Sequence, residues 1–238
     1  MLPDADSFLH RAQLSEWMDE PCSYAEFRDC LRDLMRVNRM VFGYRPTLRW
    51  LRQFAGRVNR PLRIVDVGCG AGDMLRRIER WADKNGVPVQ LTGIDRNPYA
   101  AEAAREFSGA KSRIEWLSCD AFHYNAPEGI DLVVSSLFTH HLTDSDIERF
   151  IAWMERTATL GWFINDLYRS ERFYSAFKLL ASAMRWHRFV QHDGPVSIQR
   201  SFRVHDWAEY TRRAGLQKAA LRIESAWPGR LCVARVKE

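Results

Sequence analysis

Residues 64–73 read Ile64-Val65-Asp66-Val67-Gly68-Cys69-Gly70-Ala71-Gly72-Asp73, an apolar run that leads directly into a glycine-rich turn. The β-branched residues at its start are typical of a parallel strand that is covered on both faces. The glycines permit a tight turn and a close approach of the backbone to a ligand. A helical pattern follows over residues 74–81, so we expect its N-terminal N–H groups to face the turn.

The glycine spacing and the acid beside it indicate the charge of the ligand. The pattern is G-x-G-x-G and not the G-x-G-x-x-G of a dinucleotide site. Asp66, near the strand end, would repel a pyrophosphate, whereas it suits a cation such as an α-amino group or a sulfonium. These features disfavour a nicotinamide oxidoreductase.

Acidic residues follow two of the later apolar runs. The predicted strands after the first are residues 89–94, 113–118, 130–136 and 161–166. Asp95 stands where an acid can accept hydrogen bonds from both ribose hydroxyls of a bound nucleoside. Asp120 follows the third strand. Taken singly, the glycine turn and Asp120 are compatible with structural turns, and Asp95 with the cap of a helix beginning near Pro98.

In this order and at this spacing, the motifs resemble the class I S-adenosylmethionine (SAM)-dependent methyltransferases over roughly residues 62–236. The resemblance implies SAM as cofactor and a doubly wound, Rossmann-like α/β fold with a seven-stranded mixed sheet. Residues 218–224 and 230–236 would form the last two strands, the final one antiparallel. The implied cofactor contacts are Asp66, Gly68, Cys69, Gly70 and Gly72 at the methionine part, Asp95 and Arg96 at the ribose, Asp120 and Ala121 near the adenine, and Ser136 beside the reacting methyl group.

Residues 1–57 are predicted to be a helical segment that precedes the core of residues 58–238. Three helices are expected there: one over residues 7–19, one starting at Ser23 with Glu26 completing a capping box, and one beginning near Pro46. The resemblance implies that they form a lid over SAM and help to build the acceptor pocket. Arg45 is then a candidate partner for the methionine carboxylate, with a plain surface arginine as the alternative.

Residues 167–204 are predicted to be an insertion that lines the acceptor pocket, because a simple strand–helix connection is far shorter. Ser170 can cap a helix whose apolar face carries Phe173 and Phe177, and residues 190–197 are predicted to be a loop. The stretch Asn165-Asp166-Leu167 and the later His192–Ser197 are similar to a bacterial subgroup that acts on quinone-like or polyketide small molecules.

Three histidines are candidates for a general base, which a phenolic acceptor would need. His140 and His141 follow the fourth strand on the same edge, and His192 precedes Asp193, which could orient it. A structural role for each histidine is the alternative. No metal is expected, because the cysteines and histidines lack metal-ligand spacing.

Composition narrows the range of partners. The chain has 238 residues, 46% of them hydrophobic, no run as long as a membrane span and no signal-peptide pattern. Five unpaired-looking cysteines favour a cytoplasmic protein. The net charge of +5 raises the question of a nucleic-acid substrate. However, the arginines are scattered, and Ser135-Ser136-Leu137-Phe138 lacks the signatures of base-methylating enzymes.

We therefore predict an enzyme that methylates a small aromatic or polyketide-derived acceptor, at oxygen. Neither nucleic acid nor a membrane is expected as a partner, and the chain is expected to be a monomer or a homodimer. An RNA or protein methyltransferase, or a SAM-binding module without catalysis, remains the alternative.

Overall fold

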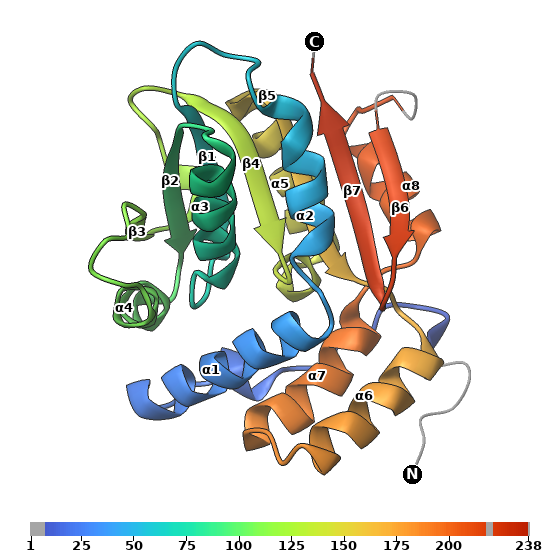
Figure 1. Ribbon diagram of the computed structural model, residues 1–238. Coiled ribbons are helices and arrows are strands. Elements are labelled where there is room, and N and C mark those ends of the chain that lie inside the picture. The colour runs from blue at the N-terminus through green and yellow to red at the C-terminus, as the bar shows by residue number, and fades with distance from the viewer. Residues whose placement is uncertain (1–7, 218–220, 238) are drawn as a thin grey trace.

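The computed structural model describes residues 8–217 and 221–237, which build a mixed sheet with helices on both faces (Figure 1). The strand order is β3-β2-β1-β4-β5-β7-β6. The first five strands are parallel, and β7 lies antiparallel between β5 and β6. The strands are β1 (Leu62–Val67), β2 (Val89–Asp95), β3 (Glu115–Ser118), β4 (Ile130–Ser136), β5 (Ala158–Leu167), β6 (Leu221–Ala226) and β7 (Arg230–Val236). The predicted fold is confirmed, although residues 218–220 of its sixth strand lie outside the described residues.

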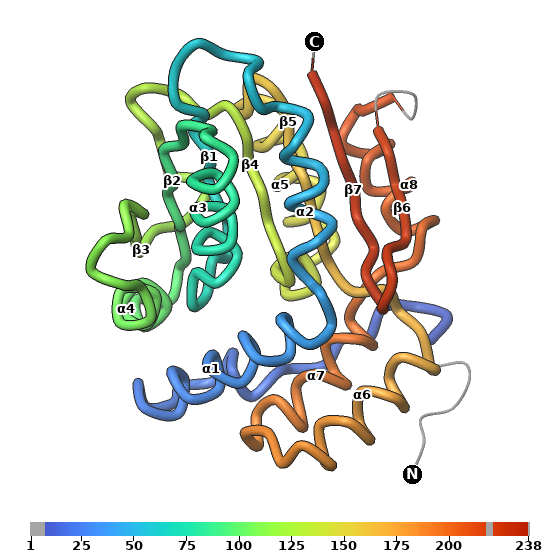
Figure 2. Tube along the Cα trace, viewed as in Figure 1, coloured from blue at the N-terminus to red at the C-terminus, as the bar shows by residue number. Residues whose placement is uncertain are grey.

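Helices cover both faces of the sheet and one of its ends. α2, α3 and α4 pack on one face, and α5 and α8 pack on the other (Figure 2). α1, α6 and α7 lie across the end toward which the arrows of β2 and β4 point (Figure 1). The α-helices are α1 (Tyr24–Met40), α2 (Arg45–Leu51), α3 (Asp73–Asn85), α4 (Pro98–Phe107), α5 (Asp144–Thr157), α6 (Glu171–Ala183), α7 (Arg188–Arg200) and α8 (Val204–Arg213). The short 3₁₀ helices are η2 (Trp17–Asp19), η3 (Arg52–Phe54), η4 (Ala121–His123) and η5 (Thr139–His141).

The apolar run that opens the glycine motif is buried on both sides of the sheet. Ile64 and Leu132 point into the core under α2, α3 and α4, whereas Val65 and Val133 point into the core under α5 and α8. A run without polar alternation is what two covered faces require. Complete burial of each such side chain contributes about 1.5–3 kcal/mol to stability.

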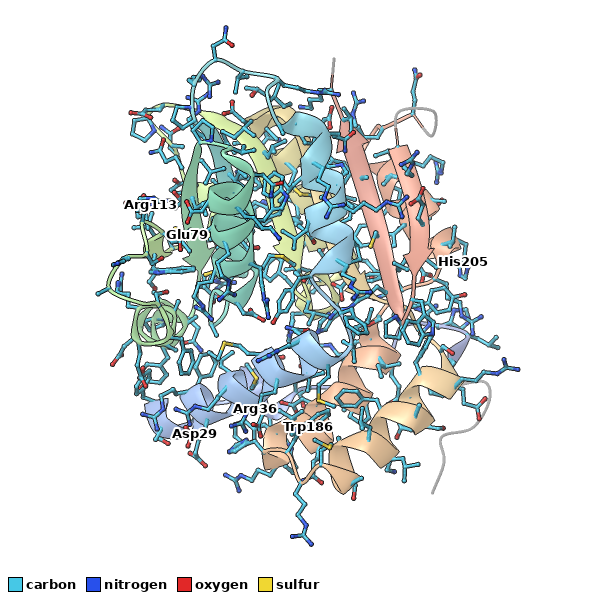
Figure 3. The ribbon with its side chains drawn as sticks, in the orientation of Figure 1. Asp29, Arg36, Glu79, Arg113, Trp186 and His205 are labelled. Atoms are coloured by element: carbon cyan, nitrogen blue, oxygen red, sulfur yellow. The ribbon has the colours of Figure 1, made fainter. Side chains whose placement is uncertain are left out.

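α1 begins and packs as its sequence predicts. Ser23 and Glu26 form the expected capping box, with the Glu26 N–H donating to Ser23 Oγ at 3.3 Å. On the side away from the sheet, Cys30 and Val37 pack with Trp186, which lies between α6 and α7 (Figure 3). Within residues 8–217 and 221–237, no helix combines the length and the hydropathy that a membrane crossing requires.

The helix predicted over residues 7–19 is wrong for most of its length. Ser7 lies outside the described residues, residues 9–16 are not helical, and only Trp17–Asp19 form a 3₁₀ turn. Arg169, which is fully buried, binds this segment instead: its Nε donates to the Phe8 carbonyl at 3.0 Å and its Nη2 to the Leu9 carbonyl at 3.1 Å. These hydrogen bonds from a residue far along the sequence pair backbone carbonyl groups that a local helix would otherwise pair.

The loop predicted over residues 190–197 is also wrong, because these residues lie inside α7. Gly194 and Pro195 suggested a loop, yet both are accommodated in the helix. A Cβ on Gly194 would lie 2.0 Å from the Phe177 ring, so this glycine allows α6 and α7 to approach closely. Burial of Phe189, Val190 and Ile198 then stabilises α7 against its neighbours.

Candidate active site

The glycine turn contains three residues in the left-handed conformation. Gly68, Gly70 and Gly72 have φ angles of 69°, 48° and 73°, which residues with a Cβ adopt only at a cost. A Cβ would lie 2.4 Å from the Phe138 ring at the first of these positions and 2.1 Å from the Trp116 ring at the third. At the middle glycine it would meet nothing closer than 3.6 Å. The turn is therefore packed tightly at both ends and open at its centre.

Replacing Gly72 by alanine is expected to destabilise the protein by about 3 kcal/mol or more, because backbone strain and overpacking against Trp116 add. Gly86 offers a matched control, since it has a φ of 63° and a Cβ there would meet no atom within 4 Å. Gly86→Ala should cost only the strain, about 1 kcal/mol. Urea unfolding of both variants measures the difference, and equal losses would contradict the packing argument.

Asp66 is a buried carboxylate without a full set of hydrogen bonds. It is 2% exposed, and its Oδ1 has no partner among the described residues. Burial, and then the charges of Asp73 and Asp95, raise the pKa of Asp66 well above its ordinary value. An anion in this position lacks a cation, which the α-amino group of a bound ligand would supply. The methionine end of SAM fits this observation.

Asp95 joins the end of β2 to the glycine turn. Its Oδ2 accepts a hydrogen bond from the Gly70 N–H at 3.0 Å, and its Oδ1 accepts one from the Asn97 N–H at 2.9 Å. Burial raises the pKa of Asp95. The residue that caps α4 is Asn97, which accepts from the Tyr99 N–H, so the capping alternative for Asp95 is wrong. Each Asp95 oxygen keeps a further lone pair, and its predicted bond to a ribose stays a prediction.

The remaining predicted cofactor residues lie along the same edge of the sheet. Asp120 caps η4 by accepting from the Phe122 N–H at 2.8 Å, and Ala121 is buried beside it. Arg96 is exposed, with its Nε 3.8 Å from Asp120 Oδ2. Ser136 ends β4. Their roles at the cofactor remain predictions.

Two of the predicted contacts are less suited to act through their side chains. Burial raises the pKa of the Cys69 thiol well above its usual range, so the thiol stays neutral, and it donates to the Gly70 carbonyl at 3.9 Å. Arg45 is exposed, and its guanidinium lies 3.8 Å from the centre of the Phe42 ring. This surface contact is the alternative that the sequence left open for Arg45.

His140 is held from behind by a buried aspartate. Its Nδ1 lies 2.7 Å from Asp166 Oδ1, and Asp166 Oδ2 accepts from the Thr139 hydroxyl at 2.5 Å and from the His140 N–H at 3.1 Å. Burial alone would raise the pKa of Asp166. The charge and hydrogen bonds of His140 have the larger, opposite effect, so the pKa of Asp166 is well below its ordinary value. With Asp166 ionised, Nδ1 carries the hydrogen and Nε2 can accept a proton.

The Nε2 atoms of His140 and His141 both face Glu16. They lie 3.8 Å from its two carboxylate oxygens, too far for a direct hydrogen bond. Burial raises the pKa of Glu16, which also accepts from the Ser197 hydroxyl at 3.0 Å. Burial also acts on Asp19, but the hydrogen bond and charge of His141 outweigh it and lower the pKa of Asp19 to about 2. Two imidazoles thus converge on one buried carboxylate.

Sequence reasoning missed Glu16 and Asp166 as members of this cluster. Asp166 is the second-last residue of β5, at the edge where Asp95 ends β2, so the signal that identified the other acids was available for it. Glu16 carried no such signal, since its segment was predicted to be helical.

In the described part of the chain, Glu16, His140 and His141 are the residues whose ligand atoms converge closely enough to hold a metal ion, within 4.8 Å of one another. The Arg200 guanidinium already lies 3.5 Å from Glu16 Oε1 and compensates its charge. The predicted role of His140 and His141 as a general base stays a prediction.

His192 and Asp193 form the predicted pair, at 2.7 Å between Nδ1 and Oδ1. Asp193 is also engaged by the N-terminal segment, because its two oxygens accept from the Trp17 and Met18 N–H groups at 2.9 and 3.0 Å. The His192 ring stacks on the Trp17 ring at 3.9 Å. The pair thus anchors η2 onto α7, and its predicted catalytic role stays a prediction.

Sequence comparison relates the central part of the chain to methyltransferases. Residues 64–161 match a family described as a methyltransferase domain. The trans-aconitate 2-methyltransferase of Streptomyces avermitilis is 29% identical over 133 residues, which is 53% of this chain and 47% of that protein. The ajmaline N-methyltransferase of Rauvolfia serpentina is 28% identical over 156 residues, 64% of this chain and 42% of that protein. The chain spans about half the length of the curated relatives it matches.

Structural comparison extends the likeness to nearly the whole chain. The plantazolicin methyltransferase BpumL was solved in complex with a pentazolic desmethylPZN analogue and S-adenosylhomocysteine (SAH). Its structure superposes on this chain with a TM-score of 0.60 at 14% sequence identity. The superposition covers 84% of this chain and 85% of that one. At this identity the likeness shows the fold.

Proposed function

We propose that this chain transfers the methyl group of SAM to an oxygen atom of a small aromatic or polyketide-derived acceptor. The premise is that the chain is a class I SAM-dependent methyltransferase in its matched domain and its fold. One observation carries the proposal: the partnerless Asp66 carboxylate lies at the same sheet edge as the buried pair of His140 and Asp166. Asp66, which would bind a cation, and the His140–Asp166 pair, which would accept a proton, therefore lie on the same edge of the sheet, called the rim below.

The chain's own residues would position the reactants. When bound, SAM supplies a methyl group already activated on a sulfonium. Asp66 would hold the amino group, the open centre of the glycine turn would contact the methionine backbone, and Asp95 would hold the ribose. Fixing the acceptor in line with the methyl carbon can supply about 7–11 kcal/mol of the barrier.

The histidine cluster would remove the acceptor's proton. Asp166 fixes the ring of His140, and both Nε2 atoms face the same space beside Glu16. His141 is the more accessible of the two, with 28% of its side chain exposed against 3% for His140. His141 is therefore our candidate for the general base, with His140 and Asp166 positioning it.

The helices that cover the rim favour a small molecule as the acceptor. α1, α6 and α7 lie across the end of the sheet where the rim residues stand (Figure 1). The tip of β4 lacks the base-methylating signatures, and the named acceptors of the matched curated relatives, trans-aconitate and ajmaline, are small molecules. The same helices and the insertion would line the acceptor pocket.

The decisive experiment supplies the purified protein with tritium-labelled SAM and separate fractions of small molecules, RNA and protein. We expect label in the small-molecule fraction. Alkaline treatment releases that label as methanol from a methyl ester, whereas a methyl ether keeps it. Label in RNA or protein alone would support the first alternative. SAM binding without label in any fraction would support a binding module.

Replacing His141 by glutamine is expected to lower kcat about 10²-fold on a phenolic acceptor, because the proton acceptor is lost while the polar contacts are largely kept. The Kd for SAM should stay within about threefold of wild type. His205, an exposed residue of α8 that is labelled in Figure 3, offers a matched control, and His205→Gln should leave kcat unchanged. An unchanged kcat for His141→Gln would remove His141 from the mechanism.

A further inference from the structure

Arg230 is a buried cation whose hydrogen-bonding capacity is mostly unused. It begins β7 and is 2% exposed. Its Nη2 donates to Asn38 Oδ1 at 2.8 Å, whereas Nε and Nη1 have no partner among the described residues. A guanidinium carries its donors in a fixed fork that matches a carboxylate or another planar anion.

The guanidinium is held in place by the backbone beside it. A Cβ on Gly43 would lie 2.5 Å from Arg230 Nη2, so the glycine lets the loop between α1 and α2 pack directly on the cation. Asn38 donates in turn to Asp73 Oδ2 at 3.2 Å, which ties the arrangement to the start of α3. Burial lowers the pKa of Arg230, as expected for a charge that lacks an anion.

The position of Arg230 is between the two halves of the candidate active site. In the β5–β7 ladder, Arg230 pairs with Leu167 and the next residue pairs with Asp166, which orients His140. On the other side, Asn38 links it to Asp73 at the end of the glycine turn. Figure 1 shows the start of β7 at the end of the sheet that α1, α6 and α7 cover. An acceptor must lie between the base and the methyl group, and Arg230 is connected to elements on both sides of that position.

The carboxylate of SAM is a less suitable partner for this cation. The amino and carboxylate groups of methionine share one carbon atom, so a receptor for the carboxylate must stand close to Asp66. The charges that act on Asp66 are those of Asp73 and Asp95. The charge that acts most strongly on Arg230 is that of Asp166. Asp73 acts on Arg230 as well, but less strongly than Asp166, so the dominant charge beside Arg230 is on the acceptor side of the rim.

We propose that Arg230 is the receptor for an ionised carboxylate of the acceptor, which the acceptor carries in addition to the hydroxyl whose proton the histidine cluster removes. The inference rests on the proposed function and narrows it. Nε and Nη1 donate to the anion, and Asn38 and Gly43 keep the fork aimed at it. Arg230 thereby selects anionic acceptors over neutral molecules of the same shape.

The test measures binding of benzoate and of its neutral analogue benzamide to the protein saturated with S-adenosylhomocysteine. Wild type is expected to bind benzoate about 10–100-fold more tightly than benzamide, as charge-assisted hydrogen bonds imply. Arg230→Met should abolish this preference, and Arg230→Lys should keep only part of it. Arg222→Met, on the exposed neighbouring strand β6, is the control and should behave like wild type.

A second arm separates the two possible sources of the anion. SAM and decarboxylated SAM are titrated into wild type and into both Arg230 variants. Equal affinities across the variants support the proposal. A loss for SAM but not for decarboxylated SAM would assign Arg230 to the methionine carboxylate and overturn it, as would equal binding of benzoate and benzamide to wild type.

Failure of the proposed function can be distinguished from failure of the Arg230 proposal. In the first case methyl transfer is absent while the preference for benzoate over benzamide persists. If Arg230→Met does not fold, Arg230→Lys still decides the outcome. A lysine variant with the full wild-type preference would overturn the role of the fork.

Discussion

Replacing Asp66 by asparagine is expected to weaken SAM binding by about 10²–10³-fold while making the ligand-free protein more stable. The loss follows from removing one partner of a buried ion pair, which costs about 3–5 kcal/mol. The gain follows because the wild-type carboxylate is buried without a cation. Because the raised pKa of this buried carboxyl opposes its ionisation in the folded state, the ligand-free Asp66→Asn protein is expected to be the more stable one near neutral pH.

The pH dependence of this gain has a definite sign. The folded-state pKa of Asp66 is raised above its unfolded value of about 3.9. Below that value the carboxyl is protonated in both states and has no effect on folding. As pH rises from about 4 through the raised pKa, the folded state loses stability relative to the unfolded state. Asp66→Asn should remove this loss, so the two ligand-free proteins should diverge as pH increases.

Calorimetric titration with SAM and thermal unfolding without ligand, from pH 5 to pH 8, measure both effects. Asp83→Asn is a suitable control, because Asp83 is an exposed carboxylate on α3. The control should change neither quantity appreciably. If Asp66→Asn bound SAM as wild type does, the cation-receptor role of Asp66 would be refuted.

Replacing Asp166 by asparagine is expected to destabilise the protein by about 3–5 kcal/mol and to lower kcat by about 10²–10⁴-fold. The Asp166 oxygens accept from four donors: the Thr139 hydroxyl, the His140 ring and N–H, and the Leu167 N–H. An amide has only one oxygen, so its NH₂ group would face donors. The His140 ring would then lose the carboxylate that fixes its hydrogen on Nδ1.

Acid should remove the same stabilisation from wild type. The folded-state pKa of Asp166 is depressed, so its contribution is present above the unfolded pKa of about 3.9 and is lost as pH falls through the folded value. The difference in unfolding free energy between wild type and Asp166→Asn should be largest near pH 6–7 and shrink below pH 4. Asp83→Asn, which changes an exposed carboxylate on α3, is the control for acid sensitivity. A difference that does not vary with pH would contradict the ion-pair interpretation.

The sheet and the cofactor edge could be predicted because their signals are local. The run from Ile64 to Asp73 encodes strand, turn and helix start in consecutive residues, and Asp95 stands at the end of the next strand. Left-handed glycines and buried β-branched residues constrain the chain wherever they occur. These features needed no knowledge of distant contacts.

The acceptor side could not be predicted in the same way, because distant contacts decide it. Gly194 and Pro195 suggest a loop, yet packing against Phe177 keeps them helical. Residues 9–16 are not helical, and Arg169, far along the chain, binds the Phe8 and Leu9 carbonyls at the start of this segment. Glu16 reaches the histidines only through that path. Tertiary contacts here override local propensity.

The path of the N-terminal segment also determines when during synthesis the site can be assembled. Glu16 meets Ser197 across 181 residues of sequence, and the Trp17 N–H meets Asp193 across 176. Contacts of such high sequence separation form only after the intervening chain exists. A ribosome must therefore release almost the whole of α7 before Glu16 can dock beside His140 and His141. A nascent chain that stops short of residue 193 would hold the glycine turn without its partner across the rim.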